Sequence, residues 1–152
     1  IRADLGPTPA QADAAESMPA ALDYASVTSL DGMRVLVVED DHEAAEMLAQ
    51  ILEDRGAKVA VAGDYDAALA HWHAERPDLL ISDIGLPGKD GYALVRALRA
   101  LEGSGKRVPA VALTAFGRAD DRDMALEAGF DLHVAKPFEL LLLLNAVRRL
   151  LG

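Results

Sequence analysis

The chain lacks several features that would place it in a specialised class. None of its 152 residues is cysteine, which excludes a disulfide framework and a thiolate metal site and suits a reducing cytoplasm. No apolar run approaches the roughly 20 residues that span a bilayer, and the first residues lack the basic-then-apolar order of a secretory signal. Basic residues number 15 against 25 acidic ones, and the net charge of −10 argues against nucleic-acid binding. We therefore expect a cytoplasmic domain that makes no direct contact with membrane or nucleic acid.

Apolar residues make up 51% of the chain, which is enough for the core of one compact domain. Residues 1–31 differ from the rest because they are rich in Ala, Pro and small polar residues, and the prolines interrupt any long helix. We expect a linker or tail over 1–31, with a docking helix as the alternative, and one domain over 32–152. Residue 1 is Ile rather than Met, which suggests a fragment or a processed chain.

From residue 33 onward, short apolar runs alternate with segments of helical periodicity. The predicted strands cover residues 34–38, 58–61, 79–82, 108–113 and 132–135. The predicted helices cover about residues 44–55, 64–76, 91–101, 118–128 and 137–151. This alternation predicts an α/β fold, a doubly wound parallel sheet with helices on both faces. Five strands fit the flavodoxin-like (βα)5 order 2-1-3-4-5, whose ligand crevice lies between strands 1 and 3.

Asp83 directly follows the buried run 79–82 and precedes a turn rich in glycine and proline. A carboxylate at the end of a buried strand costs free energy unless it has a partner, a metal or a chemical role. The acidic run 39–41 ends the first predicted strand, and in a parallel sheet it reaches the same edge. Because converging carboxylates repel one another, we expect a hard divalent cation there, Mg²⁺ or alternatively Mn²⁺.

Two further polar groups are expected at this edge. Thr114 ends the fourth strand, and Lys136 follows the fifth. A hydroxyl and an ammonium beside a metal-bound carboxylate suit phosphoryl transfer. The residues therefore predict an aspartyl-phosphate site in which Asp83 is the nucleophile, Thr114 donates a hydrogen bond and Lys136 pairs with the new negative charge. Asp41 is expected instead to cap the following helix.

Four segments resemble the four signatures of the response regulator receiver domain family: Val38–Asp41, Ser82–Gly91, Leu113–Ala115 and Val134–Phe138. The resemblance covers about residues 33–151. It implies a phosphoacceptor signalling domain, not an enzyme, that takes a phosphoryl group from a histidine kinase or its phosphotransfer domain onto Asp83. It also implies Mg²⁺ held by Asp40, Asp83 and the backbone carbonyl of Gly85, with Glu39 acting directly or through water. The peptide bond before Pro137 is expected to be cis.

Two positions depart from the commonest family pattern. Glu39 replaces the more frequent Asp, which is a mild change. His133 stands where the family usually has a switch Tyr or Phe, a side chain that turns inward as the threonine moves toward the phosphate. Histidine titrates near neutral pH, so we hypothesise that signalling strength depends on pH between about 6 and 7.5.

The wider sequence is similar to receivers at the C-terminus of hybrid sensor histidine kinases, so residues 1–31 would join a soluble or membrane-bound kinase core. We expect no effector domain after Leu151, and therefore output through a protein contact or an upstream domain. Leucines 140–144 circle their predicted helix, so some of them must be exposed or cover another surface. In the family, the fourth helix, fifth strand and last helix form the usual output surface, and we predict a protein contact there, with a homodimer through the last helix as one form.

Two other classes compete with this interpretation. A small hydrolase with a catalytic Asp usually carries its nucleophile after the first strand and needs a cap domain, whereas Asp83 follows the third predicted strand. A flavin or nucleotide binder needs a Gly-rich or Ser/Thr-rich phosphate cradle after that strand, where this chain has three acids. Both therefore rank behind the phosphoacceptor domain.

Overall fold

The computed structural model describes residues 29–114 and 119–135, apart from the side chains of 119–121 and 135. Lys136, the predicted cis bond before Pro137, the last helix with leucines 140–144, and residues 1–28 of the predicted linker lie outside this range.

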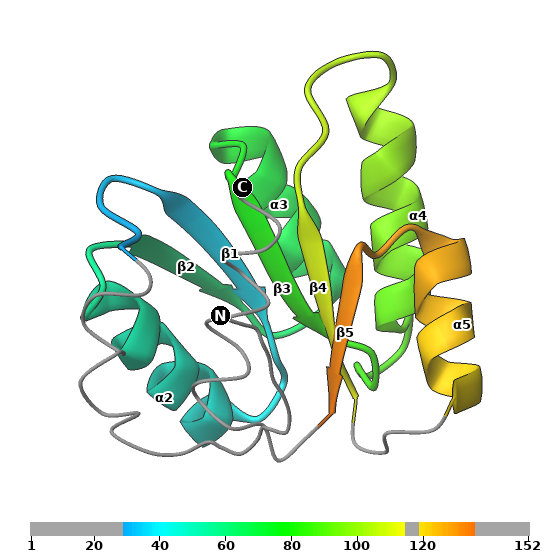
Figure 1. The fold of residues 1–152 in the computed structure, drawn as a ribbon, viewed down its shortest axis with the longest axis horizontal. Coiled ribbons are helices and arrows are strands. Elements are labelled where there is room, and N and C mark those ends of the chain that lie inside the picture. The colour runs from blue at the N-terminus through cyan, green and yellow to red at the C-terminus, as the bar shows by residue number, and fades with distance from the viewer. Residues whose placement is uncertain (1–28, 115–118, 136–152) are drawn as a thin grey trace, which may run out of the picture.

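The described residues form a five-stranded parallel sheet in the order β2-β1-β3-β4-β5, with helices between the strands (Figure 1). The strands are β1 (Arg34–Val38), β2 (Lys58–Ala62), β3 (Leu79–Asp83), β4 (Ala110–Thr114) and β5 (Leu132–Ala135). The helices are α2 (His42–Glu53), α3 (Tyr65–Ala74), α4 (Gly91–Glu102) and α5 (Ala119–Ala128). This confirms the predicted flavodoxin-like fold.

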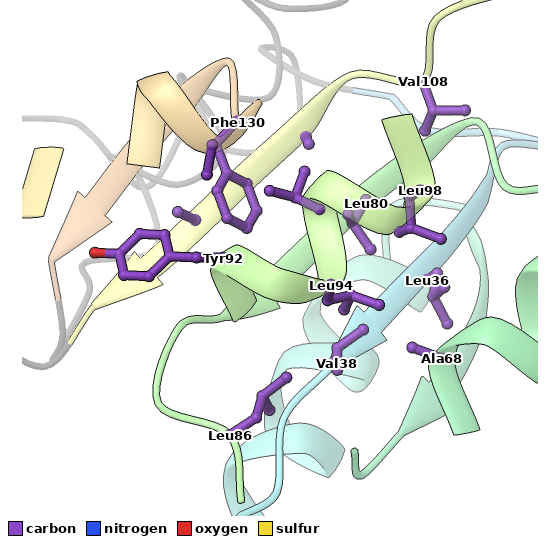
Figure 2. Packing of buried hydrophobic residues seen from close by; sticks show 14 of the residues in the cluster. Leu36, Val38, Ala68, Leu80, Leu86, Tyr92, Leu94, Leu98, Val108 and Phe130 are labelled. Carbon is purple, nitrogen blue, oxygen red and sulfur yellow. The ribbon is translucent and has the colours of Figure 1, made fainter. Parts of the chain in front are cut away.

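The two faces of the sheet bury two separate apolar clusters because successive strand residues point to opposite faces. Leu36 and Val38 of β1 join the larger cluster with α3, α4 and α5, and Figure 2 shows them beside Leu94 and Leu98 of α4. Val35 and the other strand residues that point to the opposite face of the sheet join the smaller cluster with α2. Burial on both faces explains why the strands read as continuous apolar runs.

The smaller cluster includes a residue from the predicted linker. Leu30 is buried with Leu48 and Leu52 of α2. Its N–H donates to the carbonyl of Arg55 at 2.8 Å, and the N–H of Gly32 donates to the carbonyl of Gly56 at 3.2 Å. The packed part of the domain therefore includes Leu30, two residues before the predicted boundary at residue 32.

Three of the described helices begin at an aspartate whose carboxylate accepts a hydrogen bond from a first-turn N–H. Asp41, Asp64 and Asp90 cap α2, α3 and α4 in this way, at 3.2, 2.8 and 2.9 Å. Each such cap stabilises its helix by about 1 kcal/mol. The capping role predicted for Asp41 is confirmed.

A charged network holds α4 to the start of β4 and to the turn before β5. Its centre is Arg99, whose guanidinium donates to the carboxylates of Glu102 at 2.8 Å and Asp131 at 3.1 Å. It also donates to the carbonyls of Gly129 at 2.9 Å and Val108 at 2.6 Å. We call Arg99, Glu102 and Asp131 the Arg99 network. It lies at the edge where β4 begins, opposite the edge where Asp83 ends β3.

Candidate functional site

Three carboxylates meet where β1 and β3 end. Glu39 and Asp40 directly follow β1, and Asp83 is the last residue of β3. The two strands are neighbours, with Val38 paired to Ser82, so their ends bring the acids together. One carboxylate oxygen from each acid lies within 4.8 Å of the other two. The cluster that the sequence predicted at this edge is thus present among the described residues.

The acids differ in their access to solvent. Glu39 is 4% exposed and Asp83 is 8% exposed, whereas Asp40 is exposed. Glu39 Oε2 accepts the N–H of Asp41 at 3.1 Å, which fixes its side chain beside the strand end. The site therefore has two buried carboxylates and an outer one that faces solvent.

The donor set fits a hard divalent cation. Mg²⁺ binds oxygen ligands at about 2.0–2.1 Å in an octahedron, so two of its ligands lie at most about 4.2 Å apart. The Glu39, Asp40 and Asp83 oxygens lie within 4.8 Å of one another, which is compatible with this spacing after at most a small side-chain adjustment. A cation would also relieve the repulsion among these carboxylates.

The loop after β3 holds the carboxylate of Asp83 in place. The N–H of Gly85 donates to Asp83 Oδ1 at 3.1 Å. The N–H of Ile84 continues the sheet by donating to the carbonyl of Leu113 at 3.0 Å, and the N–H of Gly91 returns to the carbonyl of Ile84 at 2.8 Å. Gly85 therefore contacts the carboxylate of Asp83 through its N–H, while the predicted role of its carbonyl as a metal ligand stays a prediction.

Gly91 is packed against the backbone of Asp83. A Cβ at Gly91 would lie 2.5 Å from the carbonyl oxygen of Asp83 and 2.8 Å from Cα of Ile84. Gly91→Ala must therefore displace the Asp83 backbone, and we expect a loss of about 1–3 kcal/mol in the free energy of unfolding. Urea denaturation measures this loss.

The matched control for Gly91→Ala is Gly63→Ala, because a Cβ at Gly63 would meet no atom within 4 Å. This variant should stay within about 0.5 kcal/mol of wild type. Equal stability of the two variants would contradict the packing described for Gly91.

Thr114 and His133 contact each other at the same edge. Thr114 ends β4 and is buried, and His133 lies on β5 and is half-buried. Thr114 Oγ1 and His133 Nε2 are 2.8 Å apart. The structure thus brings the predicted switch residue into direct contact with the predicted hydrogen-bond donor. The pH dependence hypothesised for His133 stays a prediction.

One contact near the site had no signal in the sequence. The ammonium of Lys89, in the loop after β3, lies 4.6 Å from the centre of the Tyr65 ring at the start of α3. This cation–π contact ties the loop that follows Asp83 to α3. Its two residues are 24 positions apart, and only the three-dimensional fold makes them neighbours.

Within the described residues, no helix has the length and apolar character needed to cross a membrane.

Comparison with known proteins gives a consistent result. The family model for the response regulator receiver domain matches residues 35–148. Among curated relatives, the phosphate regulon transcriptional regulatory protein PhoB of Klebsiella pneumoniae is 39% identical over 119 residues, which are 76% of this chain and 52% of that protein. The chain therefore spans about half the length of this relative.

Solved structures show the same fold. A putative response regulator from Chloroflexus aurantiacus J-10-fl is 37% identical, with a TM-score of 0.73 over 78% of this chain and 97% of its own. The receiver domain of sensor histidine kinase PA1611 from Pseudomonas aeruginosa PAO1 is 34% identical, with a TM-score of 0.71 over 80% of this chain and 98% of its own. That structure has a magnesium ion coordinated in its active site cleft.

Proposed function

Because the chain belongs to the response regulator receiver domain family, we propose that it accepts a phosphoryl group from a kinase phosphohistidine onto Asp83, with Mg²⁺ bound beside it. Receiver domains are the signalling domains of two-component systems. The observation that carries the proposal is the group of three carboxylates around Asp83, whose oxygens lie within 4.8 Å of one another. Family membership also favours a signalling domain over the hydrolase and the nucleotide binder.

The proposed step is a displacement at phosphorus. A carboxylate oxygen of Asp83 forms a bond to phosphorus while the P–N bond of the phosphohistidine breaks. The imidazole nitrogen leaves with the electron pair of that bond and takes up a proton. The N–H of Gly85, at 3.1 Å from Asp83 Oδ1, orients the carboxylate for this step.

Asp40, Asp83 and the carbonyl of Gly85 would hold Mg²⁺, with Glu39 binding directly or through water. Mn²⁺ has similar oxygen preferences and could replace it. When bound, the ion supplies positive charge to the carboxylates and to the phosphoryl oxygens. The solved relative with magnesium in its active site cleft supports this assignment.

Thr114 and Lys136 would stabilise the phosphorylated form. Thr114 follows Leu113, the register partner of Asp83 on β4, and this position supports our proposal that its hydroxyl donates a hydrogen bond to a phosphoryl oxygen. Lys136 follows β5 in the sequence, and we propose that its ammonium pairs with the same negative charge. The domain would catalyse its own phosphorylation and hydrolysis without being an enzyme for another substrate.

We also propose the surface formed by α5, β5 and the last predicted helix as the signalling surface. In its described part, Met124 and Leu126 of α5 are exposed apolar side chains, which suit a protein contact. A homodimer through the last helix is one form of this contact.

The phosphodonor would be a histidine kinase or its phosphotransfer domain in the cytoplasm. If the parent protein is a hybrid kinase, the linker over residues 1–31 would connect this domain to the kinase core.

A small phosphodonor tests the proposal without knowledge of the kinase. We expect acetyl phosphate and Mg²⁺ to add one phosphoryl group to the wild-type chain, seen as intact mass, and chelation of the metal to prevent the addition. If wild type also failed to bind beryllofluoride, a phosphoryl mimic that needs no transfer reaction, the proposed function would be wrong.

Asp40 and Asp41 form a matched pair for the metal prediction. Asp40→Asn is expected to weaken Mg²⁺ binding at least about tenfold, or 1.4 kcal/mol, because it removes a charged ligand. Asp41→Asn removes the same charge one residue away and keeps the helix cap, since Asn and Asp cap equally well. It should change Mg²⁺ affinity less than about threefold. Titration calorimetry measures both, and an equal loss in the two variants would show that net charge, not ligation, sets the affinity.

A further inference from the structure

Thr114 and His133 form a side-chain hydrogen bond between two neighbouring strands. Thr114 Oγ1 lies 2.8 Å from His133 Nε2, slightly shorter than the common N–H···O distance of about 2.9–3.0 Å. In the register of the two strands, Thr114 pairs with Ala135 and Ala112 pairs with His133. The bond therefore runs diagonally along the sheet, toward the edge that carries Asp83.

The direction of this hydrogen bond decides what the hydroxyl of Thr114 can do. A threonine hydroxyl has one proton to donate and two lone pairs that accept. If Nε2 of His133 is unprotonated, it accepts that proton, and the hydroxyl cannot donate it elsewhere. If Nε2 carries a proton, His133 is the donor, and the proton of Thr114 is available for a second acceptor.

We infer that His133 is a positioning residue for the phosphorylated state: its Nε2–H donates to Thr114 Oγ1, and the hydroxyl of Thr114 then donates to a phosphoryl oxygen on Asp83. This inference rests on the proposed function. Two hydrogen bonds in series link β5 to the phosphoryl group through a ring N–H donor that phenylalanine lacks. The bond from His133 fixes the rotamer of Thr114 and turns its one proton toward Asp83.

A series of substitutions at position 133 tests this arrangement, with Gln as the variant expected to keep the hydrogen bond to Thr114. In Gln the amide nitrogen is three bonds from Cβ, as Nε2 is in His, whereas in Asn it is only two. We expect His133→Phe and His133→Asn to weaken beryllofluoride binding in Mg²⁺ about tenfold, the worth of one hydrogen bond to a charged system. His133→Gln should stay within about threefold of wild type. In a Thr114→Ala background, His133→Phe should have no further effect, because the residue it acts through is gone.

A spectroscopic measurement on the wild-type chain tests the same inference without depending on the folding of any variant. The ¹⁵N shifts of the His133 ring should report a protonated Nε2 when beryllofluoride and Mg²⁺ are bound. An unprotonated Nε2 in that state, or equal affinities for the Phe and Gln variants, would overturn the inference while leaving phosphorylation of Asp83 intact. Absence of both beryllofluoride binding and a phosphoryl adduct in wild type would instead overturn the proposed function.

Discussion

Asp83→Asn is expected to abolish the Mg²⁺-dependent phosphoryl adduct. The amide of Asn cannot act as the nucleophile, and the substitution also removes one of the three carboxylates whose oxygens lie within 4.8 Å of one another. Asn keeps an oxygen that can accept the N–H of Gly85, the bond seen at 3.1 Å, so the loop after β3 should keep its conformation. Intact mass after incubation with acetyl phosphate measures the effect, and we expect no adduct above background.

The control lies at the other end of the same strand. Asp78 directly precedes β3, and its carboxylate accepts the N–H of Arg34 at 3.0 Å. Asp78→Asn makes the same change of charge and keeps an acceptor for that hydrogen bond. It should form the adduct as wild type does. Loss of the adduct in both variants would assign the effect to charge or stability rather than to the nucleophile.

Arg99→Met is expected to cost about 3 kcal/mol in the free energy of unfolding, because the buried carboxylate of Glu102 loses its cation at 2.8 Å and keeps only Arg76 at 3.9 Å. The side chain of Arg99 is 15% exposed and that of Glu102 is 4% exposed. Glu102 also accepts the N–H of Val108 at 2.7 Å, and Asp131 accepts the N–H of Ala110 at 2.8 Å. Removal of Arg99 therefore weakens the attachment of α4 to the start of β4 as well. Urea denaturation followed by circular dichroism measures the loss.

Arg96 provides the control for Arg99 because it is an exposed arginine on the same helix. Arg96→Met should change stability by less than about 0.5 kcal/mol. A similar loss in both variants would contradict the account of the Arg99 network. Below its unfolding transition, Arg99→Met should still form the phosphoryl adduct, since the network lies at the edge of the sheet opposite Asp83.

Sequence periodicity was enough to predict the order and kind of the described elements. Apolar strand runs and turn residues such as Gly56 and Pro77 mark the segments, and the parallel sheet follows from their alternation. The boundaries were less accurate. The fourth strand was predicted over 108–113 but covers Ala110–Thr114, because the N–H of Val108 bonds to Glu102 instead of a neighbouring strand.

The acids of the site were predictable because strand ends in a parallel sheet share one edge. Side-chain contacts between distant elements were not. Neither the bond of His133 to Thr114 nor the cation–π contact of Lys89 with Tyr65 follows from spacing along the chain. Each depends on rotamers that are fixed by packing. The Arg99 network has the same origin, since Arg99 and Asp131 are 32 residues apart.

Reductive trapping of the phosphorylated chain is the most direct test of the central claim. Borohydride converts an aspartyl phosphate to homoserine and leaves free carboxylates unchanged, so peptide mapping identifies the acceptor residue itself. We expect homoserine at position 83 alone, and only when Mg²⁺ and the phosphodonor are both present. Homoserine at position 40, or a phosphoryl group that remains on a histidine after reduction, would contradict the assignment of Asp83 as the phosphoacceptor.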